Sequence, residues 1–222
     1  MKQSGKSMRT DFILMAIMAL ISLTSFLNFK QGDLSIAGFS TIFGAILFFV
    51  FIKRDKRQGN PIGLSIKHLL NDIKISWLFI IMPSIINIIC IIISKLLLPD
   101  YIDHAVSRSD NIISFQIIAL MVIQFIIYAL LEEISWRGFL QKQLGLYTKP
   151  AISIIITSLF FSVGHATKGE PVIVAYDVLF VFFNSIFYGL VFYKTKNAFA
   201  SALSHFIANF TAALIFLFFI QK

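Results

Sequence analysis

The 222-residue chain is 58% hydrophobic and only 14% charged, with a mean hydropathy of +0.85. A single water-soluble core cannot bury that much apolar sequence, so the composition excludes a soluble globular protein and predicts a protein embedded in membrane lipids. The net charge of +8 does not indicate nucleic acid, because the basic residues lie between apolar runs and do not cluster on one face. Cys90 is the only cysteine, which excludes a disulfide framework and a four-cysteine metal site.

Seven apolar runs approach the length of about 20 residues that a helix needs to cross a bilayer. In chain order they span residues 12–29, 34–52, 75–98, 112–143, 151–165, 172–193 and 198–220. No second domain, repeat or linker is visible between them. The chain is therefore predicted to be all-α, a polytopic membrane protein forming a single integral domain over residues 1–222.

The loops between these runs predict the orientation of the chain. Basic residues concentrate in the loop 53–74 and at Lys194 and Lys196, and loops rich in lysine and arginine face the cytoplasm. We therefore expect a multi-pass protein of a cell membrane with a cytoplasmic N-terminus. Apolar residues also recur at helical spacing within residues 62–74, which predicts an amphipathic helix on the cytoplasmic surface. The richness in Ile, Phe and Lys favours a bacterial origin.

Two adjacent carboxylates, Glu132 and Glu133, directly continue the fourth apolar run. Charged residues inside a crossing cost at least about 2.5 kcal/mol each, so they point to function unless the helix ends there in solvent. Glu133 and Arg137 stand at i and i+4, a spacing at which they can pair on one helical face. Glu132 points about 100° away from that face. This spacing assigns a structural role to Glu133 and a chemical role to Glu132.

Further polar residues end or interrupt the later apolar runs. His165 closes the fifth run, and His205 and Asn209 stand at i and i+4 within the seventh, on one face of its helix. A lone histidine beside a loop, such as His165, is usually structural or interfacial. His205 and Asn209, each taken singly, are typical of hydrogen bonding between membrane helices. Asp177, about two turns into the sixth run, is a secondary candidate that could face a cavity or the outer surface.

The depths of these residues provide a test of whether they can meet. With a rise of about 1.5 Å per residue, Glu132 lies about 16 Å, His165 about 22 Å and His205 about 12 Å from the cytoplasmic ends of their helices. These depths are similar only if the fourth helix continues past its glutamates to about residue 143. We therefore expect one cavity, reached from the cytoplasm and lined by all three helices.

The three clusters resemble the motifs of a known family. Glu132, Glu133 and Arg137 fit E-E-x-x-x-R, Phe161 with His165 fits F-x-x-x-H, and His205 with Asn209 fits H-x-x-x-N. Their order and placement resemble the CPBP (CAAX protease and bacteriocin-processing) family of intramembrane endopeptidases, which is related to the Ras-converting CAAX endopeptidase. The resemblance covers about residues 112–210, which we take as the catalytic core.

This resemblance implies a set of roles for the motif residues. Glu132 and His165 would hold and activate a water, while His205 and Asn209 would stabilise the oxyanion; Glu133, Arg137 and Phe161 would support them. Glu132, His165 and His205 could instead form a zinc site with two histidines and one carboxylate. Asn209 fits an oxyanion donor better than a zinc ligand, so we favour a mechanism with no obligatory metal.

Other functions remain open at this level. A membrane protein without catalysis, conferring bacteriocin self-immunity or scaffolding, would also keep a polar cavity. A small transporter would explain buried charge, but the sequence has no repeated halves. The H-E-x-x-H signature of zinc membrane proteases is absent. The expected partners are membrane lipids and a peptide substrate at the membrane, such as a lipidated C-terminus or a leader peptide; no residue pattern chooses among these or indicates an oligomeric state.

Overall fold

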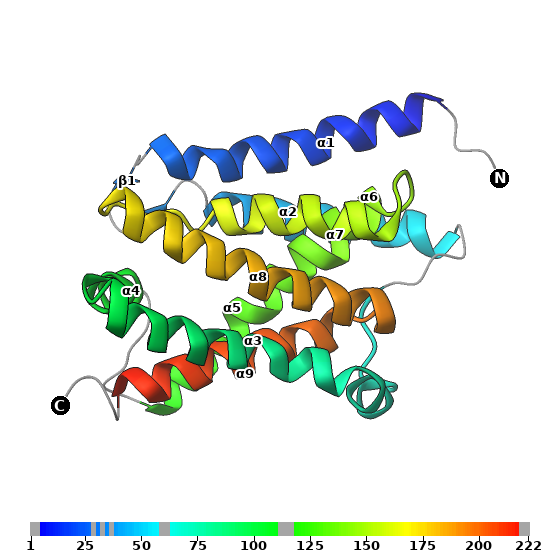
Figure 1. Ribbon diagram of the computed structural model, residues 1–222. Coiled ribbons are helices and arrows are strands. Elements are labelled where there is room, and N and C mark those ends of the chain that lie inside the picture. The colour runs from blue at the N-terminus through cyan, green and yellow to red at the C-terminus, as the bar shows by residue number, and fades with distance from the viewer. Residues whose placement is uncertain are drawn as a thin grey trace.

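The computed structural model describes residues 5–27, 30–31, 34–35, 38–57, 63–110 and 118–217, which form a helical bundle (Figure 1). The α-helices are α1 (Gly5–Leu23), α2 (Phe39–Arg57), α3 (Leu69–Leu97), α4 (Asp100–Asp110), α5 (Ile118–Glu133), α6 (Lys142–Leu144), α7 (Pro150–Val163), α8 (Pro171–Thr195) and α9 (Ala198–Ile215). The other elements are the 3-10 turn η1 (Thr24–Leu27), the π-helix η3 (Ile134–Gln141), and an antiparallel pair of two-residue strands, β1 (Lys30–Gln31) and β2 (Leu34–Ser35). The predicted all-α class is confirmed.

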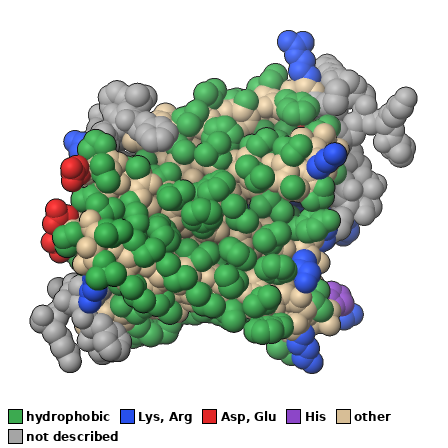
Figure 2. Space-filling view, in the orientation of Figure 1, with side chains coloured by type: hydrophobic (Ala, Val, Ile, Leu, Met, Phe, Trp, Pro, Cys, Tyr) green, Lys and Arg blue, Asp and Glu red, His purple; other side chains and the backbone are tan. Residues whose placement is uncertain are grey.

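The helices and the surface have the properties of a membrane protein. Within the described residues, four helical stretches are long and apolar enough to cross a bilayer, namely Leu69–Leu97, Ile118–Leu144, Pro171–Thr195 and Ala198–Ile215. The other three predicted crossings correspond to α1, α2 and the 14-residue α7. Figure 2 shows apolar side chains across the middle of the molecule, with most of the visible lysines and arginines at one end and the visible acidic residues at the other. We call these the basic end and the acidic end.

The surface helix predicted over residues 62–74 is not a separate element, which corrects that expectation. Residue 62 lies outside the described part of the chain, Gly63 has a left-handed φ of +90°, and α3 begins only at Leu69. The apolar spacing seen in the sequence therefore includes the first turns of α3. A surface helix and the start of a longer helix share the period of 3.6 residues, so spacing alone cannot separate them.

The fourth predicted crossing continues past its two glutamates, as the depth argument required. Helix α5 continues into η3 and then α6 without a break from Ile118 to Leu144. All eight residues of η3 are buried, and α2, α5 and α7 pack against it. A π-helix has wider turns than an α-helix and is frequent at functional sites. Here the π-helix begins directly after Glu133, and its residues are buried inside the bundle.

A tight connection makes α8 and α9 antiparallel neighbours. Proline at the first position of α8, Pro171, fits a helix start because its missing N–H needs no partner there. The helix stops at Lys196, whose φ of 53° is left-handed. Asn197 then caps α9, since its side-chain oxygen accepts a hydrogen bond from the N–H of Phe199 at 3.2 Å. The two helices therefore lie side by side over several turns.

Candidate active site

Three side chains predicted from the sequence converge from three helices. Oε1 of Glu132, near the end of α5, lies 3.9 Å from Nε2 of His165, which lies just beyond the end of α7. Oε2 of Glu132 lies 3.7 Å from Nε2 of His205 on α9. The side chains of Glu132 and His165 are 23% and 28% exposed, whereas that of His205 is 6% exposed. The carboxylate therefore lies between two imidazoles and is partly accessible, whereas the ring of His205 is almost fully buried.

The ring of His165 is oriented by the backbone of α7. Its Nδ1 lies 2.8 Å from the carbonyl oxygen of Phe161. A carbonyl oxygen only accepts hydrogen bonds, so Nδ1 carries the proton and donates it. In the neutral ring, the unprotonated Nε2 then faces Glu132.

The ring of His205 is oriented by the second glutamate. Its Nδ1 lies 3.1 Å from Oε1 of Glu133, and a carboxylate favours the tautomer in which Nδ1 donates. The two nitrogens of His205 thus face two different carboxylates, Glu133 through Nδ1 and Glu132 through Nε2.

Glu133 is part of a buried network that connects three helices. The predicted pairing with Arg137 is confirmed, with Nη1 of Arg137 donating to Oε1 of Glu133 at 3.1 Å and both side chains fully buried. Arg137 also donates to the hydroxyl of Ser185 on α8 at 2.6 Å, and Ser201 on α9 donates to Oε2 of Glu133 at 2.6 Å. A buried charge is tolerated when it is paired and hydrogen-bonded. The supporting side chains are therefore held between α8, α9 and η3.

Two aromatic rings enclose the histidines. The ring of Phe161, which is 1% exposed, lies with its centroid 4.5 Å from that of His165 and 5.8 Å from that of His205. The guanidinium of Arg137 lies over the same ring at 4.6 Å. On the other side of the site, Tyr188 stacks on His205 with centroids 4.5 Å apart and planes inclined by 18°. Phe161 thus contacts all three motifs.

The last two predicted residues have different positions. Asn209 is partly buried one turn beyond His205 on α9, and its amide makes no hydrogen bond to any residue that the structure describes. Asp177 is not part of this site. Its buried carboxylate accepts a hydrogen bond from Tyr101 of α4 at 3.3 Å and lies 3.9 Å from Nε2 of His104. Asp177 therefore attaches α4 to α8, about 16 Å along α8 from Tyr188.

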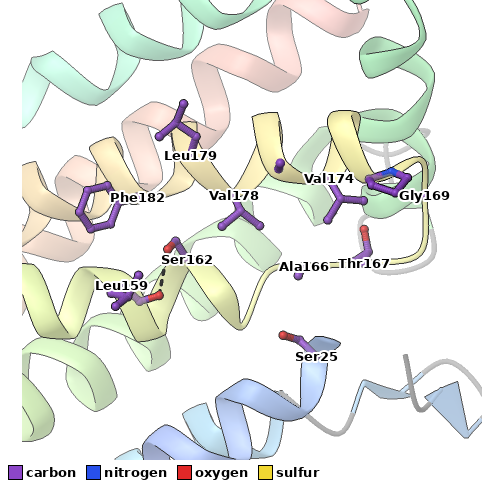
Figure 3. Close-up of a pocket in the computed structure, with 12 residues that line it drawn as sticks. Ser25, Leu159, Ser162, Ala166, Thr167, Gly169, Val174, Val178, Leu179 and Phe182 are labelled. Carbon is purple, nitrogen blue, oxygen red and sulfur yellow. Dashed lines mark hydrogen bonds between the residues drawn. The ribbon is translucent and has the colours of Figure 1, made fainter. Parts of the chain in front are cut away.

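An apolar cavity lies beside the site and not over it. Its volume is about 560 Å³, and Figure 3 shows it between α7 and α8, with Ser25 at its edge. Ser162 and Ala166, which stand on either side of His165 in the sequence, line the cavity. The side chains of Glu132, His165 and His205 are not among its lining residues. The other lining residues are mainly apolar.

The fit of a zinc ion to this arrangement is poor. Ligands at about 2.0–2.1 Å from a tetrahedral zinc lie roughly 3.4 Å apart, which is shorter than the separations of 3.7 and 3.9 Å. In the part of the chain that the structure describes, no group of three or more His, Cys, Asp and Glu side chains is arranged to hold a metal ion.

Several residues of the site were missed in the sequence. Ser185 and Tyr188 on α8 and Ser201 on α9 bond or stack with motif residues. Only Ser201 could have been suspected from spacing, because it stands four residues before His205 and therefore on the same helical face. Serine and tyrosine are common in apolar helices, so spacing alone does not separate them from ordinary packing residues.

Comparison with known proteins agrees with the motifs. Residues 114–211 match the family model described as Type II CAAX prenyl endopeptidase Rce1-like. No curated protein and no solved structure matches the chain. The matched segment contains Glu132, His165, His205 and Asn209. The predicted family resemblance is therefore confirmed over this segment, and residues 114–211 are similar to the type II CAAX prenyl endopeptidases of the Rce1-like family.

Proposed function

We propose that this protein is an intramembrane endopeptidase in which Glu132 activates a water molecule for attack on a peptide bond. The observation that supports the proposal most directly is the convergence of Glu132 with Nε2 of both His165 and His205. The separations exceed the range of about 2.7–3.2 Å for direct hydrogen bonds and suit polar groups that share a small bridging molecule.

In this proposal, His165 and Glu132 hold the attacking water together. Nδ1 of His165 donates to the carbonyl of Phe161, so its Nε2 is unprotonated in the neutral ring and can accept one hydrogen of the water. Glu132 accepts the other hydrogen and takes it as the general base when the oxygen attacks. A positioned base typically contributes about 100- to 10,000-fold to the rate. The same carboxylic acid can then protonate the leaving nitrogen.

His205 and Asn209 would stabilise the oxyanion that forms on the carbonyl. The proposal requires a proton on Nε2 of His205, in addition to the one that Nδ1 donates to Glu133. Charge balance supports this state, because imidazolium and Arg137 together neutralise Glu132 and Glu133. Donors aimed at a developing oxyanion contribute about 100- to 1,000-fold each.

The substrate is proposed to be a membrane-associated peptide that enters from the cytoplasm. Glu132 lies about 18 Å along the helix from its end at Leu144, so the scissile bond must be brought below the membrane surface. The expected orientation puts the basic end of the molecule (Figure 2) in the cytoplasm, which is the side from which the proposal has the substrate enter. The apolar cavity beside His165 would accept an apolar group of the substrate.

The experiment that tests this proposal compares wild type with Glu132→Gln in proteoliposomes. The probes are a quenched fluorogenic peptide with a C-terminal CAAX sequence, in prenylated and unmodified forms, and total membrane peptides analysed by mass spectrometry. Wild type should generate new peptide termini that the variant does not. Glu132→Gln retains size and polarity, so melting in detergent should be unchanged. Equal processing by both proteins would overturn the mechanism.

A non-catalytic role in bacteriocin immunity is the alternative outcome. If cells carrying Glu132→Gln stay immune and neither protein cleaves any probe, the cavity serves binding and not catalysis. If immunity and cleavage are lost together, immunity depends on proteolysis.

A further inference from the structure

A chain of side-chain amides connects three helices beside the candidate active site. Nδ2 of Asn184 on α8 donates to Oδ1 of Asn87 on α3 at 2.6 Å. Nδ2 of Asn87 in turn donates to the backbone carbonyl of Ala208 on α9 at 3.0 Å. Ala208 is fully buried and directly precedes Asn209. The chain therefore ends on the helical turn between His205 and Asn209.

The direction of this chain follows from hydrogen-bond chemistry. The carbonyl of Ala208 can only accept, so the amide group of Asn87 that faces it must be Nδ2. The oxygen of Asn87 then faces Asn184, which must donate through its own nitrogen. Oδ1 of Asn184 remains buried and without a partner among the described residues.

This arrangement is poorly explained by stability alone. A buried amide oxygen without a partner carries a desolvation cost, and such groups in a native structure call for a reason. Helix α3 is the most apolar of the four long helices and lies outside the matched segment 114–211. The side-chain amide of Asn87 nevertheless donates its hydrogen bond to the turn of α9 that carries Asn209, the proposed oxyanion donor.

We propose that Asn87, oriented by Asn184, is a positioning residue that fixes the turn of α9 from His205 to Asn209. This inference rests on the proposed function. It assigns to α3 a part in catalysis without contact with the substrate. A hydrogen bond from a side-chain amide to a carbonyl of the helix limits rotation and sliding of that turn. Displacement of a catalytic group by about 1 Å can lower a rate by about 100-fold.

The test is a double-mutant cycle between Asn87→Leu and Asn209→Ala in proteoliposomes, using whichever probe peptide wild type cleaves. Asn87→Leu should lower kcat by about 10- to 100-fold and leave KM within about twofold. In the Asn209→Ala background the same change should have little further effect, because the two residues act through one turn. Asn87→Ala, which also removes the donor and introduces no ionisable group, should behave like Asn87→Leu.

The matched control removes a second hydrogen bond between the same helices. Thr211 on α9 donates to Ser84 on α3 at 3.4 Å, and Ser84→Ala should leave kcat unchanged. Equal kcat in Asn87→Leu and wild type would overturn the inference, as would full additivity of the two changes in the cycle. Failure of the proposed function is distinguishable, since Glu132→Gln would then cleave as wild type does. If Asn87→Leu does not fold, Asn87→Ala and the control still decide the outcome.

Discussion

Glu132 and Glu133 are neighbours in the chain but contact opposite nitrogens of one imidazole. Glu133 lies 3.1 Å from Nδ1 of His205, and Glu132 lies 3.7 Å from its Nε2. Glu133 is fully buried, whereas the side chain of Glu132 is 23% exposed. The same ring therefore connects a buried structural carboxylate to an accessible one, and two identical residue types acquire different roles.

The pair of Glu133 and Arg137 should contribute to both stability and activity. Glu133→Gln leaves the fully buried guanidinium without its counter-charge, which should lower the free energy of unfolding by about 3–5 kcal/mol. The double change Glu133→Leu with Arg137→Met should recover much of that stability, because no buried charge remains. It should stay inactive, since His205 has lost its orienting carboxylate. Melting in detergent measures the effect on stability, and peptide cleavage measures the effect on activity. A fully active double variant would contradict the role of Glu133 in orienting His205.

Phe161 should be needed for the geometry of both histidines. Its ring contacts His165 and His205 and is buried, so Phe161→Ala should destabilise the protein by about 3–5 kcal/mol and release both imidazoles. Phe161→Leu, which leaves a smaller void, is the matched comparison and should retain more stability and part of the activity. Thermal melting with cleavage rates at a temperature where both variants are folded provides the check. Wild-type kcat in folded Phe161→Ala would show that the ring only fills space.

The stacking of Tyr188 on His205 should depend on the ring and not on the hydroxyl. Tyr188→Phe retains the stacked ring and is expected to cleave at close to the wild-type rate. Tyr188→Ala should lower kcat several-fold to about tenfold, as expected for an aromatic pair worth about 0.5–1.5 kcal/mol. A large loss in Tyr188→Phe would instead indicate that the hydroxyl takes part in the reaction.

Chelation addresses the metal alternative. We expect cleavage to persist after dialysis against EDTA and 1,10-phenanthroline, with no zinc retained by the purified protein in elemental analysis. The control is a zinc membrane protease treated in the same way, which should lose activity. Loss of cleavage in this protein, followed by recovery with added zinc, would overturn the mechanism without a metal and favour the zinc site of Glu132, His165 and His205.

Tyr147 should give the protein an alkaline transition. Its hydroxyl donates to Asp11 at 2.9 Å, and burial with this hydrogen bond raises the pKa of Tyr147 to about 12. The folded pKa lies above the unfolded value of about 10, so this contribution to stability is complete below pH 10 and lost as the pH approaches 12. The melting temperature in detergent should therefore fall more steeply between pH 10 and pH 12 in wild type than in Tyr147→Phe. Ultraviolet titration of tyrosinate that finds Tyr147 ionising near pH 10 would contradict the assignment.

Much of the candidate site could be predicted because ionisable side chains are rare within membrane-spanning helices. In an apolar chain, an ionised or imidazole side chain within a crossing stands out against its surroundings, which is how Glu132, His165 and His205 were found. The i and i+4 spacing of Glu133 and Arg137 likewise predicted their contact, since the geometry of a helix fixes it locally.

The predictions that went wrong or were missed depend on contacts between distant segments. The start of α3 was interpreted as a surface helix, because one period describes both. Tyr188 and Asn87 were not singled out, because aromatic and amide side chains become part of a site only through the helices that pack against them. The membrane class and the three motifs could be predicted because composition and helical spacing are local properties of the chain. The approach of Glu132 to two Nε2 atoms, the orientation of one ring by Glu133 and the contact of α3 with the turn of Asn209 could not. These are distances between helices, and no local pattern encodes them.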